Sequence, residues 1–227
     1  SAGVQELEKV LGAPVVDRAR SGVILTAIGE DAVRRGADIL ARTEDLVQAA
    51  RSSGQPLTGR FRLGVIPTVA PFLLPKALPL LRQRHPKLSL FLREDLTHRL
   101  ISALKAGALD AALIALPYET AGLETAQVGE DELMAALPEN HPLCRGPRVS
   151  PERLEHEDLI LLEDGHCLRE HALAVCGMER PRLGEEGFAA TSLHTLVQMV
   201  GSGLGVSLVP AMAVEAGLAR GVPISVL

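Results

Sequence analysis

The hydrophobic pattern of the chain changes character at residues 52–56, where serine, glycine and proline cluster. Before this break, apolar pairs recur every seven residues at Ala32-Val33, Ile39-Leu40 and Leu46-Val47. The spacing predicts a long helix over residues 27–51 whose apolar stripe favours a partner helix. Burial against its own domain is the alternative, but the flanking segments offer little to pack on. The break itself indicates a flexible linker.

Two short elements are predicted ahead of the long helix. Apolar residues at helical spacing over residues 4–11 stop at Gly12, which is typical of a helix end. Two β-like runs, at residues 15–16 and 23–25, then flank the segment from Arg18 to Gly22. This arrangement predicts a small hairpin with a basic tip that contains Arg18 and Arg20.

Beyond the break, strand and helix patterns alternate. Strand-like alternation or buried apolar runs are separated by segments of helical spacing, and the series then repeats in a second unit. We infer an α/β fold of two lobes with mostly parallel sheets, and we expect ligand sites where the carboxyl ends of the strands meet the cleft. The predicted strands are 61–65, 88–92, 111–116, 133–137, 159–162, 206–209 and 222–227, and the main helices are 71–84, 97–106 and 192–200.

Two threonines fall where predicted strands of the first lobe end. Thr68 follows the first strand and Thr97 follows the second, so both hydroxyls are expected at the cleft. The plain structural interpretation is that Thr97 caps the next helix and that Thr68 belongs to a turn beside Pro67. For Thr97 the sequence alone favours the cap. A capping hydroxyl can also serve a ligand, so the two interpretations are compatible.

The candidate chemistry of the second lobe centres on Cys167. This residue follows an apolar strand and an acidic turn, and it begins a helix-like segment that closes on Cys176. A thiol at a helix start, beside His166 and near Arg169, is placed where the reactive thiolate is favoured. Cys176 then suits a resolving partner. The alternative is that two small buried residues simply bracket an ordinary helix.

Composition excludes several classes of protein. A hydrophobic content of 47% with 22% charged residues is typical of a soluble globular protein, and three cysteines indicate a reducing compartment rather than a disulfide scaffold. One tyrosine and no tryptophan argue against a base-stacking platform. We find neither a transmembrane-length apolar run nor a secretory signal, so we expect a cytoplasmic protein, although the chain begins at Ser1 without an initiator methionine.

Specific motifs resemble the LysR-type transcriptional regulators. Residues 7–18 (LEKVLGAPVVDR) resemble the end of that family's recognition helix and the entry to its wing, and residues 26–30 (TAIGE) resemble the start of its linker helix. The resemblance implies two Rossmann-like lobes similar to periplasmic binding proteins, preceded by a long linker helix and a partial winged helix-turn-helix. The implied domains are a partial DNA-binding domain at 1–26, a dimerisation helix at 27–52, a hinge at 53–58, an incomplete regulatory lobe I at 59–130 and a regulatory lobe II at 131–227.

Within that family, three segments resemble the sensors of hydrogen peroxide: residues 162–169 (LEDGHCLR) with Cys176, residues 67–71 (PTVAP) with Thr97-His98, and residues 188–193 (FAATSL). The resemblance implies that Cys167 is the peroxidatic cysteine and Cys176 the resolving one. It further implies that Thr68, Thr97 and His166 bind peroxide, that Arg169 supports the thiolate, and that Arg18 and Arg20 contact DNA. Cys144 has no counterpart, and the first helices of the DNA-binding domain and the last segment of the first lobe are missing.

The expected function is therefore that of a redox-switched regulator and not of an enzyme. The expected partners are double-stranded DNA, a second or further copy in a homodimer or homotetramer, hydrogen peroxide, a thioredoxin- or glutaredoxin-type reductant and RNA polymerase; no cofactor, metal or membrane is expected. A regulator that binds a small organic effector in the same cleft is the first alternative. A thiol peroxidase is disfavoured because no threonine shortly precedes Cys167, and an extracytoplasmic solute-binding protein would leave the heptad helix unexplained.

Overall fold

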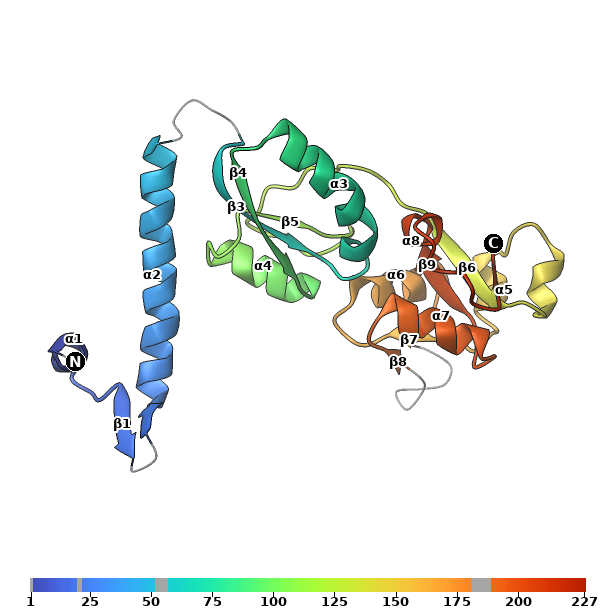
Figure 1. Ribbon diagram of the computed structural model, residues 1–227. Helices are drawn as coiled ribbons and strands as arrows, with labels where there is room; N and C mark the ends of the chain where they lie inside the picture. The colour runs from blue at the N-terminus through green and yellow to red at the C-terminus, as the bar shows by residue number, and fades with distance from the viewer. Residues whose placement is uncertain (1, 20–21, 52–56, 181–188) are drawn as a thin grey trace. The chain divides into compact units, whose positions relative to one another are not determined.

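The computed structural model describes residues 2–19, 22–51, 57–180 and 189–227 (Figure 1). Contacts within the chain divide it into two compact units, Ser1–Arg60 and Phe61–Leu227. Among the described residues, none of the helices has the length and apolar character needed to cross a membrane.

The N-terminal unit is built from a hairpin between two helices. Strands β1 (Val16–Ala19) and β2 (Gly22–Leu25) pair antiparallel, after helix α1 (Ala2–Leu11) and before helix α2 (Ala27–Arg51). The hydroxyl of Thr26 accepts a hydrogen bond from the Gly29 backbone N–H at 3.0 Å, which satisfies one of the unpaired groups at the start of α2. The predicted apolar stripe of α2 is open to solvent within the single chain, with Val33, Ile39, Leu40 and Leu46 between 58% and 71% exposed.

Arg18 lies on β1, whereas Arg20 lies outside the described residues. The proposed DNA contacts of these two arginines stay predictions.

The next elements form what we call lobe I, from strand β3 to strand β5. Its sheet has the order β4-β3-β5, with β3 and β5 parallel, and helices α3 and α4 lie on opposite sides of it (Figure 1). Gly64 of β3 allows close packing, because a Cβ atom there would come within 2.6 Å of Leu100 and 2.7 Å of Leu109. The elements are β3 (Gly59–Val65), α3 (Ala70–Arg84), β4 (Leu88–Glu94), α4 (Thr97–Lys105) and β5 (Ala111–Leu113).

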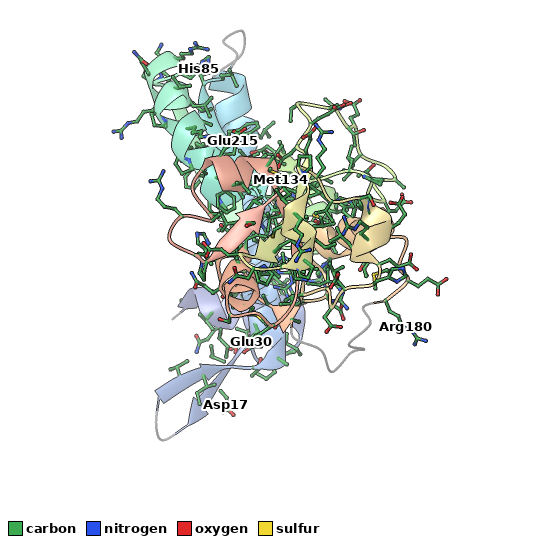
Figure 2. The ribbon with its side chains drawn as sticks, turned by 90° about the vertical axis from the view of Figure 1, so that its right-hand side faces the viewer. Asp17, Glu30, His85, Met134, Arg180 and Glu215 are labelled. Carbon is green, nitrogen blue, oxygen red and sulfur yellow. The ribbon has the colours of Figure 1, made fainter. Side chains whose placement is uncertain are left out.

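The remaining elements form what we call lobe II, from strand β6 to strand β10. Its core lies in two clusters of buried residues on either side of the strands, and the Met134 side chain of β6, seen in Figure 2, packs against one of them. The elements are β6 (Leu133–Pro138), the 3₁₀ helix η1 (Pro142–Arg145), α5 (Pro151–Leu154), β7 (Leu161–Leu162), α6 (Cys167–Val175), β8 (Ala189–Ala190), α7 (Leu193–Gly201), β9 (Ser207–Pro210), α8 (Ala211–Glu215) and β10 (Ile224–Val226).

The strand directions in lobe II differ from the prediction of mostly parallel sheets. Strands β7 and β8 are parallel, but β6 is antiparallel to both of its neighbours, β9 and β10. The physical reason is the path of the chain: β6 enters lobe II after the crossover from lobe I and lies between two strands that run the other way. Periodicity along the sequence predicts a strand but carries no information on its direction.

Candidate functional site

The site is built around the turn that joins β7 to α6. Gly165 in this turn has a φ of +93°, a conformation that side-chain-bearing residues rarely adopt. A Cβ atom at Gly165 would also lie 3.1 Å from Leu96 and 3.4 Å from the His98 ring. The turn of lobe II therefore lies directly against the start of α4 in lobe I, and only glycine fits this approach.

Cys167 is the first residue of α6, as the sequence predicts, so it lies among the first-turn N–H groups that have no partner within the helix. Its side chain is 4% exposed and packs in a cluster that otherwise belongs to lobe I, with Ile66, Leu100 and Ala103. The thiol of a lobe II helix thus completes the core of lobe I.

Cys176 lies at the other end of α6, where it is the C-cap. It is 3% exposed and packs in the second cluster of lobe II, with Leu137 and Leu159 among its members. Burial raises the pKa of the Cys176 thiol, and the charge of Glu155 adds to the effect. The two sulfurs belong to different clusters, and both are free thiols.

Cys144 is partly buried in η1, where its thiol donates a hydrogen bond to the Pro138 carbonyl at 3.5 Å. An open hollow of about 460 Å³ lies beside the Cys176 end of α6 and is lined by Glu155, His156 and Arg180, the last of which projects into solvent in Figure 2. Neither cysteine lines this hollow.

Thr97 is not the N-cap of α4, so the interpretation that the sequence favoured is wrong. The N-cap is Leu96, whose N–H donates a hydrogen bond to the Asp95 carboxylate at 2.9 Å, and Thr97 is the first helical residue. The Thr97 side chain is 1% exposed, and its hydroxyl has no hydrogen-bond partner among the described residues. A buried hydroxyl without a partner costs about 1–3 kcal/mol, which makes this group a candidate ligand contact.

Thr68 and His166 meet in a cavity of about 370 Å³ between the two lobes. Thr68 is 5% exposed and follows β3, while His166 is the N-cap of α6. Burial lowers the pKa of the His166 imidazole, although the nearby Glu163 partly opposes this. Near neutral pH the ring is therefore mostly neutral, which argues against the positive charge beside Cys167 that the sequence suggested.

Other residues that line this cavity were not predicted as site residues, although Ser192 falls within the motif at residues 188–193. Phe72 of α3 stacks on the His194 ring with centroids 5.9 Å apart, and both line the space. Ser192 lines it as the N-cap of α7, where its hydroxyl accepts a hydrogen bond from the Thr195 N–H at 3.2 Å. The signal for Ser192 was present as a serine directly before a helical pattern, whereas Phe72 and His194 look like ordinary helix residues.

Two polar contacts fix the Arg169 side chain to the strand end and turn that precede α6. Its Nε lies 2.8 Å from the Asp164 carboxylate, and its guanidinium also donates to the Leu162 carbonyl at 3.2 Å. These contacts close the turn ahead of Cys167, which fits support of the site through the shape of the loop. Support of the Cys167 thiolate by Arg169 stays a prediction.

The fold of two α/β lobes with a site between them belongs to a known class of regulatory domain. Residues 54–224 match the model of the LysR substrate binding domain, and the chain belongs to this family, whose members are transcriptional regulators. This agrees with the expectation of a regulator in place of an enzyme.

Within the family, the chain is similar to OxyR-type regulators. A "probable hydrogen peroxide-inducible genes activator" of Mycobacterium avium is 42% identical over 214 residues, 94% of this chain and 69% of that protein. The "DNA-binding transcriptional dual regulator OxyR" of Escherichia coli K12 is 36% identical over 94% of this chain and 70% of its own. The HTH-type regulator EstR of Acinetobacter baylyi is 39% identical over 95% of this chain and 71% of its own.

Solved structures agree with the sequence relatives. A peroxide-bound cysteine mutant of Corynebacterium glutamicum OxyR superposes with a TM-score of 0.74 at 30% identity, covering 99% of this chain and 70% of that one. The reduced form of the regulatory domain of OxyR2 from Vibrio vulnificus gives 0.67 at 40% identity, covering 75% of this chain and 80% of that one.

Proposed function

We propose that the protein is a redox-sensing LysR-type regulator that detects hydrogen peroxide through Cys167 and controls oxidative-stress genes through a Cys167–Cys176 disulfide. The observation that carries the proposal is the buried, unpartnered hydroxyl of Thr97. Its sequence neighbours Leu96 and His98 lie against Gly165, two residues before Cys167, and Leu100 one turn further along α4 shares a cluster with Cys167. A polar group kept without a partner at this place suits a small polar ligand.

The chemistry follows from the groups around the sulfur. The Cys167 thiolate attacks one peroxide oxygen, the O–O bond breaks, and the second oxygen leaves as hydroxide that takes up a proton to become water. Thr68, Thr97 and neutral His166 would donate or accept hydrogen bonds to the two oxygens as charge moves between them. The first-turn N–H groups of α6 favour negative charge on the sulfur.

The second step couples the chemistry to a change of structure. The Cys176 thiolate attacks the sulfenic sulfur of Cys167, the S–S bond forms and the sulfenic oxygen leaves as water, so two thiols and one peroxide give one disulfide and two waters. An intact helix would hold the two Cα atoms ~13 Å apart, whereas a disulfide tolerates at most ~7 Å. Helix α6 therefore has to open, which would change the packing between regulatory domains in a dimer or tetramer and reposition the heads on double-stranded DNA. A thioredoxin- or glutaredoxin-type reductant would reset the switch.

The test is mass spectrometry of thiol states after one equivalent of hydrogen peroxide. We expect a Cys167–Cys176 disulfide in the parent chain and in Cys144→Ser, and none in Cys167→Ser. If Cys144→Ser abolished the response while Cys167→Ser kept it, the assignment would be reversed.

A second candidate function rests on the size of the cavity, because 370 Å³ is far more than one peroxide molecule needs. It is a regulator of the same family that binds a small organic effector between the lobes. On that view, an effector would raise the melting temperature of Cys167→Ser as much as that of the parent chain, and peroxide would leave the Cys167–Cys176 pair reduced.

A further inference from the structure

Helix α6 lies where three clusters of buried residues meet. Cys167 belongs to the lobe I cluster, Leu168 to the first cluster of lobe II, and Leu173 to the second. The polar contacts of Arg169 stay local, because Leu162 and Asp164 belong to the strand end and turn directly ahead of the helix. His171 is different, since its Nε2 atom lies 3.1 Å from the Pro117 carbonyl oxygen, 54 residues away along the chain.

The position of His171 links this contact to the reactive thiol. His171 comes four residues after Cys167, so the two side chains lie on the same face of α6, one turn apart. On the other side of the contact, Ala115 and Tyr118 flank Pro117 and pack against the cluster that contains Cys167. The cluster that contains the thiol and the hydrogen bond of the imidazole therefore meet at the same short stretch of chain, at the start of the crossover between the lobes.

The direction of the hydrogen bond between His171 and Pro117 follows from its acceptor. A carbonyl oxygen only accepts hydrogen bonds, so the Nε2 atom of His171 must carry the hydrogen. The bond ties the middle of α6 to a segment outside lobe II. It exists only while residues 167–171 are helical, because unwinding carries the imidazole away from Pro117.

We infer that the His171–Pro117 hydrogen bond is a latch that holds α6 closed and thereby sets the balance between the dithiol and disulfide forms. The inference rests on the proposed function, since it needs a Cys167–Cys176 disulfide. The latch stabilises the dithiol form alone, and its removal shifts the balance toward the disulfide by the worth of one partly exposed hydrogen bond, about two- to tenfold.

The sign of the effect separates the latch from a plain helix position. Alanine is a better helix former than histidine, so without a latch His171→Ala would strengthen α6 and shift the balance toward the dithiol. With the latch, the lost hydrogen bond opposes this gain, so His171→Ala lies further toward the disulfide than a variant that gains helix propensity alone. Val175→Ala is the matched control, because Val175 is 43% exposed on the same helix and its substitution changes helix propensity without removing a side-chain hydrogen bond.

The experiment equilibrates the chain in glutathione buffers of varied ratio, in a Cys144→Ser background, and measures the Cys167–Cys176 disulfide by mass spectrometry. The two thiols of the protein give two electrons and two protons to glutathione disulfide, which becomes two molecules of glutathione. Relative to Val175→Ala, which gains helix propensity alone, we expect His171→Ala to need about two- to tenfold less oxidising glutathione ratios. His171→Gln should restore much of the parent value through its amide N–H, and Val175→Ala should shift slightly toward the dithiol relative to the parent.

The possible outcomes separate the latch from the function on which it rests. A parent chain that never forms the Cys167–Cys176 disulfide would overturn the proposed function. A parent that forms it, with His171→Ala no further toward the disulfide than Val175→Ala, would overturn the latch alone. If His171→Ala does not fold, His171→Gln and His171→Asn decide the question, because the shorter Asn side chain should not reach Pro117 and should behave as unlatched.

Discussion

The two ends of helix α6 place their cysteines in different surroundings. Cys167 packs against lobe I at the first turn of α6, directly after His166, which lines the cavity between the lobes. Cys176 is buried wholly within lobe II, where burial and Glu155 raise the pKa of its thiol. Both are almost completely buried, so exposure alone does not distinguish them.

This difference shows that the surroundings of Cys167 and Cys176, more than their spacing along the sequence, distinguish a candidate reactive thiol from a candidate resolving thiol. Under the proposed function, peroxide would react at Cys167, whereas Cys176, whose raised pKa favours the protonated thiol, would reach it only after α6 opens. The sensor and the switch would then be the same nine-residue element, α6.

The largest expected effect comes from bringing the two ends of α6 together in a Cys167–Cys176 disulfide. Forming the disulfide should open α6 and expose Leu168 and Leu173, at a cost of about 1.5–3 kcal/mol for each side chain. We expect amide protection across residues 167–175 to fall about a hundredfold or more on oxidation. Hydrogen exchange followed by mass spectrometry measures this, with α7 of the same lobe as the internal control. Unchanged protection in a sample whose disulfide is confirmed would rule out the proposed switch.

The next effect sharpens the contrast on the Cys167 side. Thr97→Val keeps the shape of the side chain and removes the unpartnered hydroxyl, so oxidation by peroxide should slow about ten- to a thousandfold. The same substitution should stabilise the resting protein by about 1 kcal/mol, because a buried group without a partner is gone. Stopped-flow thiol loss and thermal unfolding measure the two effects.

Thr68→Val and an alkylating agent serve as the comparisons for that experiment. Thr68→Val should also slow the peroxide reaction, whereas the rate of alkylation should change much less in both variants, since alkylation needs no peroxide-binding hydroxyl. Equal losses toward both reagents would mean that the threonines only pack.

The features that the sequence predicted correctly depend on interactions between residues close together in the chain. Helix α3 was predicted at residues 71–84 in spite of two internal prolines, because its apolar spacing outweighs them, and the structure keeps Pro75 and Pro79 inside it. The start of α6 at Cys167 was likewise readable from the turn ahead of it.

What the sequence could not show depends on contacts between distant segments. The cap prediction for Thr97 is wrong because α4 begins one residue earlier than a threonine cap requires: Leu96 is the N-cap, and Thr97 is the first helical residue with a buried hydroxyl that has no partner among the described residues. The packing of Cys167 onto lobe I and the contact of His171 with Pro117 join residues about fifty or more positions apart. No periodicity in a single sequence encodes such pairs.

The smallest expected effect concerns the Cys176 side. Because the folded protein raises the pKa of this thiol above its ordinary value of 9.0, folding favours the protonated form. That contribution to stability is complete below pH 9 and is lost as the pH rises through the folded pKa. The free energy of unfolding of the reduced chain should therefore fall more steeply above pH 9 than that of Cys176→Ala. The free energies of unfolding come from denaturant titrations at each pH. If they fall equally steeply with pH in the two proteins, the burial of Cys176 carries no such penalty.

The sharing of Cys167 between the lobes has a consequence for how the regulatory unit unfolds. Lobe I borrows a core side chain from lobe II, and its neighbours there, Ile66 and Leu100, are almost fully buried. Removal of Cys167 from this cluster would leave a void beside Ile66 and Leu100 and would weaken the packing between the lobes. We therefore expect the thermal unfolding of the oxidised chain to be broader than that of the reduced chain, because the two lobes would share fewer buried contacts.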